Sequence, residues 1–211
     1  MNIFFDLDGT LLDSSDRLYD LFCDLIPQNN MTKSEYWNLK RNKINHKNIL
    51  LNEFNYSEEE FIKFEQTWLA KIETEKYLLK DKLKINTDKI LKNLSKNNNL
   101  FIVSARQSKI NAINELKRLN IIDFFKEIFI TENKYTKEEL IKNFYNIDKN
   151  IFIGDTGYDI LTGKNLNMLT IAICDGFLSK EKLIEYKPDY LIDTINKIEN
   201  ILERLKSPVC Y

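Results

Sequence analysis

The stretch NIFFDLDGT, residues 2–10, places a short apolar run directly before two aspartates, Asp6 and Asp8. An apolar run without polar alternation is typical of a strand that is covered on both faces, as in a parallel sheet. Alternation along a strand directs Asp6 and Asp8 to the same side, at the carboxyl end where open α/β sheets bind ligands. Because close carboxylates repel each other, we expect them to coordinate a cation or to share a proton. Gly9 allows a sharp backbone path directly after them.

Apolar runs of strand length recur along the chain, and helical patterns separate them from residue 86 onward. The runs are rich in Ile, Phe and Val and lack clean alternation, which favours strands buried on both faces. The expected strands are Asn2–Leu7, Leu100–Ser104, Glu127–Thr131, Asn150–Gly154, Leu169–Cys174 and Asp189–Ile192. The expected helices are Asn86–Lys96, Lys109–Leu119, Lys137–Phe144 and Thr194–Leu205. This alternation predicts an α/β fold, a doubly wound core around a mostly parallel, Rossmann-like sheet.

The stretch between the first two strands has a different character, because residues 15–82 contain no convincing strand. Its pattern predicts about four helices: Asp16–Ile26, Thr32–Asn42, His46–Phe54 and Ser57–Leu79. Capping-box pairs support this reading and also mark one core helix: Thr32 with Glu35, Ser57 with Glu60, and Thr136 with Glu139. A crossover between parallel strands needs only one helix. We therefore expect an all-helical domain of residues 15–82, inserted into a core formed by residues 1–14 and 83–211.

The composition excludes several classes of function. The chain has 211 residues, and 31 Lys and Arg stand against 32 Asp and Glu, so its net charge of −1 gives no general attraction to nucleic acid or to an anionic membrane. Three widely separated cysteines and a single histidine, His46, argue against disulfide frameworks, zinc sites and histidine-based triads. The N-terminus does not resemble a signal peptide, and no apolar stretch approaches a membrane span, so we expect a cytoplasmic protein.

A second pair of carboxylates follows the fourth expected core strand, in the sequence GDTGYD of residues 154–159. Asp155 and Asp159 join Asp6 and Asp8, and oxygen ligands without histidine favour a hard cation, Mg²⁺ before any other. The second strand ends in the hydroxyl of Ser104. Lysines follow the third strand, and of Lys134 and Lys137 the latter is favoured because it lies in the first turn of a helix. A phosphate site is typically built from such groups: a hydroxyl, an ammonium and helix N-terminal amides around Mg²⁺.

These motifs, in this order, resemble the four signatures of the haloacid dehalogenase superfamily. The sequence DLDGTLLDS, residues 6–14, is similar to the first signature, and FIVS, residues 101–104, is similar to the second. Lys137 corresponds to the third, and GDTGYD to the GDxxxD form of the fourth. Each lies at an expected strand end or helix start, and the resemblance extends from residue 2 to about residue 205. Ordinary turn or cap aspartates would not produce all four motifs together.

The resemblance also indicates a subgroup. The stretches DGF, residues 175–177, and PDYLID, residues 188–193, are similar to the tail of phosphoglycolate-phosphatase-like members. The helical insert after the first motif resembles the C1 cap of that subgroup. The presence of Asp8 favours phosphoryl transfer, because members resembling the dehalogenases proper lack this second aspartate and release a halide that needs no proton.

The resemblance implies a role for each motif residue. Asp6 would be the nucleophile that takes the phosphoryl group as an aspartyl-phosphate. Asp8 would protonate the leaving oxygen and then deprotonate the attacking water. Ser104 and Lys137 would hold the phosphoryl oxygens and neutralise the charge that spreads over them in the transition state.

The resemblance likewise implies a metal site. Mg²⁺ would be held by the carboxylates of Asp6 and Asp155 and by the backbone carbonyl of Asp8. Asp159 would lie next to these ligands and keep them in position. Mg²⁺ is accordingly the expected cofactor.

Substrate specificity is the least determined feature of the sequence. In the helical insert, Lys40 or Arg41 can reach the cleft and bind a substrate anion, or can form a solvated basic face beside a buried Trp37. Arg106 follows Ser104 closely enough to contact a leaving group, or can be a surface residue at a helix start. These alternatives remain open at this stage.

The leading hypothesis is a cytoplasmic, Mg²⁺-dependent phosphatase that hydrolyses a small phosphorylated metabolite, with no nucleic-acid or membrane partner. A phosphosugar mutase resembling β-phosphoglucomutase would use the same aspartyl-phosphate but return the group to the sugar. A catalytically idle binding protein of the same fold is the third possibility, and the complete set of motif residues argues against it. The substrate and the oligomeric state cannot be inferred from the sequence.

Overall fold

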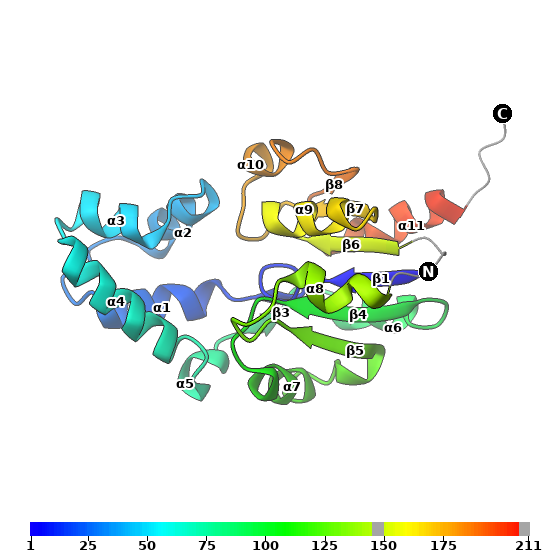
Figure 1. Ribbon diagram of the computed structural model, residues 1–211, viewed down its shortest axis with the longest axis horizontal. Helices are drawn as coiled ribbons and strands as arrows, with labels where there is room; N and C mark the ends of the chain where they lie inside the picture. Colours follow the sequence, from blue (N-terminus) through cyan, green and yellow to red (C-terminus); the bar gives the residue numbers. More distant parts are fainter. Residues whose placement is uncertain (145–149, 207–211) are drawn as a thin grey trace.

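A six-stranded parallel sheet forms the centre of the computed structural model, which describes residues 1–144 and 150–206 (Figure 1). Its strands lie in the order β5-β4-β1-β6-β7-β8, and every neighbouring pair is parallel. Their bounds are β1 Asn2–Phe5, β4 Asn99–Ser104, β5 Phe125–Ile130, β6 Asn150–Gly154, β7 Leu169–Ile173 and β8 Tyr190–Ile192. The chain runs outward from β1 through β4 to β5 and then returns to the other side of β1. This reversal of strand order creates the ligand-binding crevice of a doubly wound sheet, so the predicted fold class is confirmed.

Helices cover both faces of the sheet. Along β1, Ile3 and Phe5 pack into one apolar layer with α6, α7 and α11, whereas Phe4 packs with α8 on the other face. Burial on both sides explains why the strand sequences show no alternation. The core helices are α6 Thr87–Leu94, α7 Lys109–Arg118, α8 Lys137–Ile141, α9 Gly157–Asn165, α10 Lys180–Ile184 and α11 Ile198–Lys206, with short 3-10 turns at Ile122–Phe124, Lys142–Phe144 and Ile195–Lys197.

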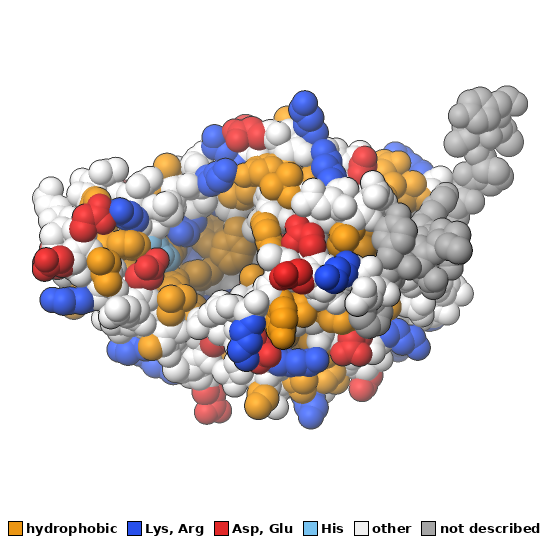
Figure 2. Space-filling view, in the orientation of Figure 1, with side chains coloured by type: hydrophobic (Ala, Val, Ile, Leu, Met, Phe, Trp, Pro, Cys, Tyr) orange, Lys and Arg blue, Asp and Glu red, His pale blue; other side chains and the backbone are white. Residues whose placement is uncertain are grey.

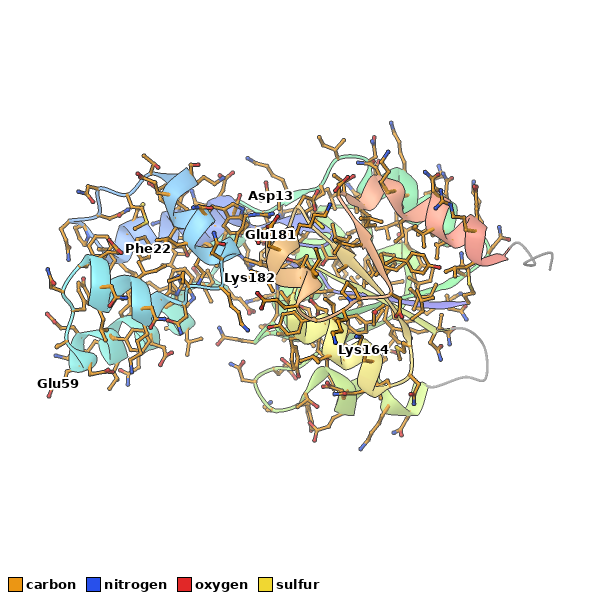
Figure 3. All side chains as sticks on the ribbon, turned by 90° about the horizontal axis from the view of Figure 1, so that it is seen from above. Asp13, Phe22, Glu59, Lys164, Glu181 and Lys182 are labelled. Carbon is orange, nitrogen blue, oxygen red and sulfur yellow. The ribbon has the colours of Figure 1, made fainter. Side chains whose placement is uncertain are left out.

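The helical insert lies beyond the carboxyl ends of the strands (Figure 1). It comprises α1 Ser15–Leu25, α2 Lys33–Arg41, α3 His46–Glu53, α4 Glu58–Lys71 and α5 Glu75–Leu78. It has its own apolar cluster, in which Phe22 and Tyr36 are fully buried; Figure 3 shows Phe22 inside the insert and Glu59 at its outer end. The capping boxes predicted at Thr32 and Ser57 are both present. None of the helices in the described ranges is long and apolar enough to cross a membrane.

The insert departs from the prediction in one place. The stretch 57–79 was expected to be a single helix, but α4 ends at Lys71 and α5 begins at Glu75. Between them, the Glu73 carboxylate accepts hydrogen bonds from the backbone N–H groups of Gln107 and Ser108, at 2.7 and 3.1 Å. This tie to the core ends α4, and helical periodicity carries no sign of such a contact.

A short two-stranded ribbon connects the insert to the core. β2, Leu12–Asp13, pairs antiparallel with β3, Lys82–Leu83, so the outgoing and returning chain segments are hydrogen-bonded to each other. Figure 3 shows Asp13 at this junction. Two-residue strands are too short to produce a periodic pattern, which is why the sequence did not indicate them. The ribbon holds the insert over the same edge of the sheet that carries Asp6.

His46, the only histidine of the chain, lies among aromatic rings in the insert. Its Nε2 is 2.8 Å from the Tyr36 hydroxyl, and its ring centroid is 4.2 Å from that of Trp68. Burial, and secondarily the charge of Lys40, hold the pKa of His46 well below its usual value. The folded protein therefore keeps this imidazole neutral.

We predict that His46 makes the protein less stable as the pH falls below about 6.5, the ordinary pKa of histidine in an unfolded chain. Below that pH the unfolded state binds a proton that the folded state does not, which favours unfolding by up to about 1.4 kcal/mol per pH unit. Urea denaturation of the wild type and of His46→Gln at pH 7.5 and 5.5 measures this effect. The stability difference between the two proteins should shift in favour of the variant at pH 5.5; a difference that is the same at both pH values contradicts the prediction.

Candidate active site

A buried ion cluster lies at the carboxyl end of β1. The Nζ of Lys137, at the start of α8, donates to Oδ1 of Asp6 and to Oδ1 of Asp159, both at 2.6 Å. Asp155 follows the neighbouring strand β6, and one carboxylate oxygen each from Asp6, Asp155 and Asp159 lie within 4.8 Å of one another. All four side chains are almost completely buried. The structure thus places Lys137 at Asp6, whereas Lys134 is exposed at the surface.

Asp155 is held in a narrow space. Thr10 donates to its Oδ1 at 2.7 Å, and the Phe177 backbone N–H donates to its Oδ2 at 2.6 Å. A Cβ placed on Gly9, whose φ is +81°, or on Gly176 would lie 2.2 Å from that same Oδ2. Glycine is therefore required at both positions, in the first case also by its left-handed backbone conformation.

Asp159 has two tasks that use different oxygens. Its Oδ2 accepts hydrogen bonds from the backbone N–H and the hydroxyl of Thr156, at 3.0 and 2.6 Å, and so completes a capping box at the start of α9. Its Oδ1 faces Lys137. This arrangement fixes the carboxylate to a helix N-terminus and lets it position the lysine.

The charges of the cluster do not balance. Burial raises the pKa of Asp6 well above its usual value, against the attraction of Lys137, and the neighbouring carboxylates of Asp159 and Asp155 raise it further. Burial and the charge of Asp159 raise the pKa of Asp155 to about 7. Three carboxylates face a single ammonium, and a divalent cation would remove this imbalance. A buried set of carboxylate oxygens is the donor type that Mg²⁺ prefers, so the residues present fit that ion.

Asp8, two residues after Asp6, has the opposite environment. Its carboxylate accepts hydrogen bonds from the Ser14 hydroxyl at 2.8 Å, from Arg17 at 2.6 Å and from two nitrogens of Arg106 at 2.7 Å each. Burial alone would raise the pKa of Asp8, but Arg106 and Arg17 outweigh it and hold the pKa well below its usual range. Asp8 is therefore separated electrostatically from the Asp6 cluster.

The two arginines belong to a larger buried network that sequence reasoning missed. Arg106 pairs with Asp81 at 3.0 Å and with Glu115, and Arg17 lies 3.3 Å from Asp81. Burial and the charges of Asp8 and Glu115 raise the pKa of Asp81 to about 8, although Arg17 opposes this. The partners are far apart in the sequence and belong to no shared motif, so no local signal points to them.

A cavity of about 460 Å³ opens in front of the Asp6 cluster and the network around Asp8. The core contributes Asp6, Ser104 and Lys137 to its wall, and the insert contributes Leu69 and Ile72. Figure 2 shows the hollow between the insert and the core, with hydrophobic side chains at its back. The motif residues predicted from the sequence thus converge on one open cavity, lined by Asp6, Asp8, Ser104, Lys137 and Asp159, and only Asp155 lies behind its wall.

The three candidate specificity residues have different surroundings. Arg106 lines the cavity, but its guanidinium pairs with the carboxylates of the buried network. Arg41 does not line this cavity. Its guanidinium donates to the backbone carbonyls of Cys174 and Gly176, at 2.6 and 2.5 Å. Lys40 lines a separate cavity inside the insert.

The fold and this cluster are those of a haloacid dehalogenase-like hydrolase. The family model with that description matches residues 3–173, which is most of the chain, so the protein belongs to the haloacid dehalogenase-like hydrolases and is an enzyme. The resemblance seen in the sequence motifs is confirmed.

Individual relatives agree with this assignment. A curated Clostridium perfringens protein named "Putative pyrophosphatase PpaX" is 29% identical, and the alignment covers 97% of this chain and 98% of the relative. A haloacid dehalogenase-like hydrolase of Streptococcus pneumoniae has a similar structure, with a TM-score of 0.77 at 23% identity over 95% of this chain and 97% of that one. The Bacillus subtilis hydrolase YfnB, solved with bound magnesium, gives a TM-score of 0.64 at 19% identity over 96% and 98%.

We predict that Arg106→Met destabilises the fold by about 3 kcal/mol or more, because it removes the guanidinium that pairs with Asp8, Asp81 and Glu115 in the buried network. Urea denaturation at pH 7.5 measures the loss. Arg204→Met, which removes an arginine from the exposed face of α11, is the matched control and should change stability by less than about 0.5 kcal/mol. Equal stability of the two variants contradicts the prediction.

Proposed function

We propose that this protein is a Mg²⁺-dependent phosphatase that hydrolyses a small phosphomonoester through an aspartyl-phosphate on Asp6. The observation that carries the proposal is the buried contact of Asp6 with Lys137 beside Asp155 and Asp159, in a cavity lined by Ser104. The pyrophosphatase name of the Clostridium perfringens relative supports the broader reaction class, hydrolysis of a phosphate compound.

The metal would be held by Asp6, Asp155 and the backbone carbonyl of Asp8, with Asp159 positioning its neighbours through Lys137 and Thr156. When bound, Mg²⁺ withdraws charge from the phosphoryl oxygens and offsets the repulsion among the carboxylates.

The chain's own residues perform the remaining steps. An Asp6 oxygen attacks phosphorus, the bond to the leaving oxygen breaks, and the phosphoryl group is transferred to Asp6. The Ser104 hydroxyl and the Lys137 ammonium hold the phosphoryl oxygens as negative charge spreads over them. Asp8 gives a proton to the leaving oxygen and then takes one from the water that hydrolyses the aspartyl-phosphate.

Asp8 has to change its hydrogen bonds before it can take part in proton transfer. A carboxylate that accepts hydrogen bonds from Ser14, Arg17 and Arg106 has to give up some of them before it can carry a proton. Arg17 belongs to α1, and Ser14 directly precedes that helix. A movement of the insert that shifts α1 would therefore release two of the three donors, which links proton transfer to the position of the insert.

We predict that Asp6→Asn abolishes phosphate release, because an amide is a poor nucleophile toward phosphorus. Release of phosphate from p-nitrophenyl phosphate and from a panel of phosphorylated metabolites measures this, with Mg²⁺ and with EDTA. The wild type should be active only with the metal. Asp123→Asn, which alters an exposed aspartate without a hydrogen-bonded partner among the described residues, should keep full activity. A folded Asp6→Asn protein that still turns over substrate contradicts the mechanism.

We also predict that Gly176→Ala weakens metal binding, since the added Cβ would lie 2.2 Å from Oδ2 of Asp155 and displace it. The expected effect is about a tenfold rise in the Mg²⁺ dissociation constant, measured by calorimetry, and in the Mg²⁺ concentration for half-maximal activity. Most of the turnover rate should return at saturating Mg²⁺. Unchanged metal affinity in the variant means that Asp155 does not hold the ion.

A further inference from the structure

The turn that follows β4 carries the Ser104 hydroxyl, which lies at the wall of the catalytic cavity. Ser104 is 2% exposed, and its hydroxyl makes no hydrogen bond with another residue of the ranges 1–144 and 150–206. Because no partner fixes this hydroxyl directly, its position depends on the backbone of residues 104–108.

The core holds this turn by its carbonyl groups. The backbone N–H groups of Thr131 and Glu132, in the segment after β5, donate to the carbonyls of Ser104 and Arg106, both at 3.0 Å. These two hydrogen bonds fix the beginning of the turn against the neighbouring segment of the core. The N–H groups further along the turn bind to the insert instead.

Glu73 of the insert, between α4 and α5, is the acceptor for those N–H groups. One of its carboxylate oxygens accepts from the N–H of Gln107 and the other from that of Ser108. Two side-chain amides add to this contact: Gln107 Nε2 donates to the Leu69 carbonyl at 3.1 Å, and Asn111 Nδ2 donates to the Glu73 carbonyl at 2.9 Å. In all four hydrogen bonds the core donates and the insert accepts, so they depend on the position of the insert.

Neither helix capping nor charge accounts for a carboxylate at this place. α7 already has a cap of its own, because the Ser108 hydroxyl accepts from the N–H of Asn111 at 3.2 Å. Glu73 also lines the catalytic cavity, where a negative charge opposes the binding of a phosphate. What the carboxylate does provide is a hold on the turn after Ser104.

We propose that Glu73 is a positioning residue for phosphoryl transfer, which acts by fixing the turn that carries Ser104. The inference rests on the proposed phosphatase function and adds a residue of the insert to the groups on which that reaction depends. With Glu73 in contact, the turn is held at both of its ends, and the Ser104 hydroxyl is kept where it can donate to a phosphoryl oxygen. Without Glu73, the turn is held at one end only, and the hydroxyl spends less time in that position.

A double-mutant cycle with Ser104 tests this coupling. Glu73→Ala should lower kcat/KM for p-nitrophenyl phosphate about tenfold and should weaken the binding of inorganic phosphate, measured by calorimetry with Mg²⁺, about fivefold. The loss of a negative charge alone would strengthen phosphate binding, so the two explanations predict opposite signs. In Ser104→Ala the hydroxyl is already absent, and the addition of Glu73→Ala should change either quantity by less than about twofold.

Glu75→Ala is the matched control. It removes an exposed carboxylate two residues away, at the start of α5, that makes no hydrogen bond or ion pair with a residue in the described part of the chain. Both quantities should stay within about twofold of the wild type. Glu73→Gln keeps one acceptor oxygen and should lie between Glu73→Ala and the wild type. It replaces Glu73→Ala in the cycle if circular dichroism shows that the alanine variant does not fold.

The two measured quantities separate this inference from the proposed function. Phosphate binding that is unchanged or tighter in Glu73→Ala overturns the positioning role, and so do effects of the two substitutions that multiply in the double variant. If the wild type releases no phosphate from any substrate while the cycle on phosphate binding shows the coupling, the phosphatase function fails and Glu73 remains the residue that positions Ser104 toward phosphate.

Discussion

The contact of one ammonium with two buried carboxylates is the interaction on which the rest of the site depends. Lys137 reaches Asp6 and Asp159 from the start of α8, and without it three carboxylates would face each other with no positive charge of the protein between them. The strand order brings these residues together: Asp6 follows β1, Asp155 and Asp159 follow the neighbouring β6, and Lys137 lies on the segment after β5. Because the strands are parallel, these segments all lie at one edge of the sheet. The parallel sheet is thus the framework that makes such a costly cluster possible.

Asp6 and Asp8 show how one strand end serves two kinds of chemistry. They are separated by one residue, yet burial and the neighbouring carboxylates raise the pKa of Asp6, whereas Arg106 and Arg17 hold that of Asp8 low. The difference comes from the chain around them: the core surrounds Asp6, and the junction with the insert surrounds Asp8. Because Arg17 belongs to α1, a movement of that helix would change the contacts of Asp8 but not those of Asp6.

Features with a local cause could be predicted from the sequence. Covered strands, the aspartates that follow them and the capping boxes at Thr32, Ser57 and Thr136 each depend on residues within a few positions, and the structure contains them. Features with a distant cause could not. The end of α4 depends on Glu73 binding backbone N–H groups of the core, and the network around Arg106 joins residues from four separate segments. Lys137 is favoured over Lys134 by its place in the first turn of a helix, but its contact with Asp6 becomes visible only in the fold.

Lys40 and Arg41 are another pair of residues whose surroundings the sequence alone does not distinguish. Neighbouring residues of an α-helix point about 100° apart, so two adjacent cations at the end of α2 face different surroundings. Arg41 binds carbonyls of the loop that also supplies the Phe177 N–H to Asp155, and therefore ties the insert to a residue that we propose to hold the metal. Lys40 lies instead, partly exposed, on the wall of a cavity of the insert that His46 and Trp68 also line. The structural role therefore falls to Arg41, and helix geometry alone separates its surroundings from those of Lys40.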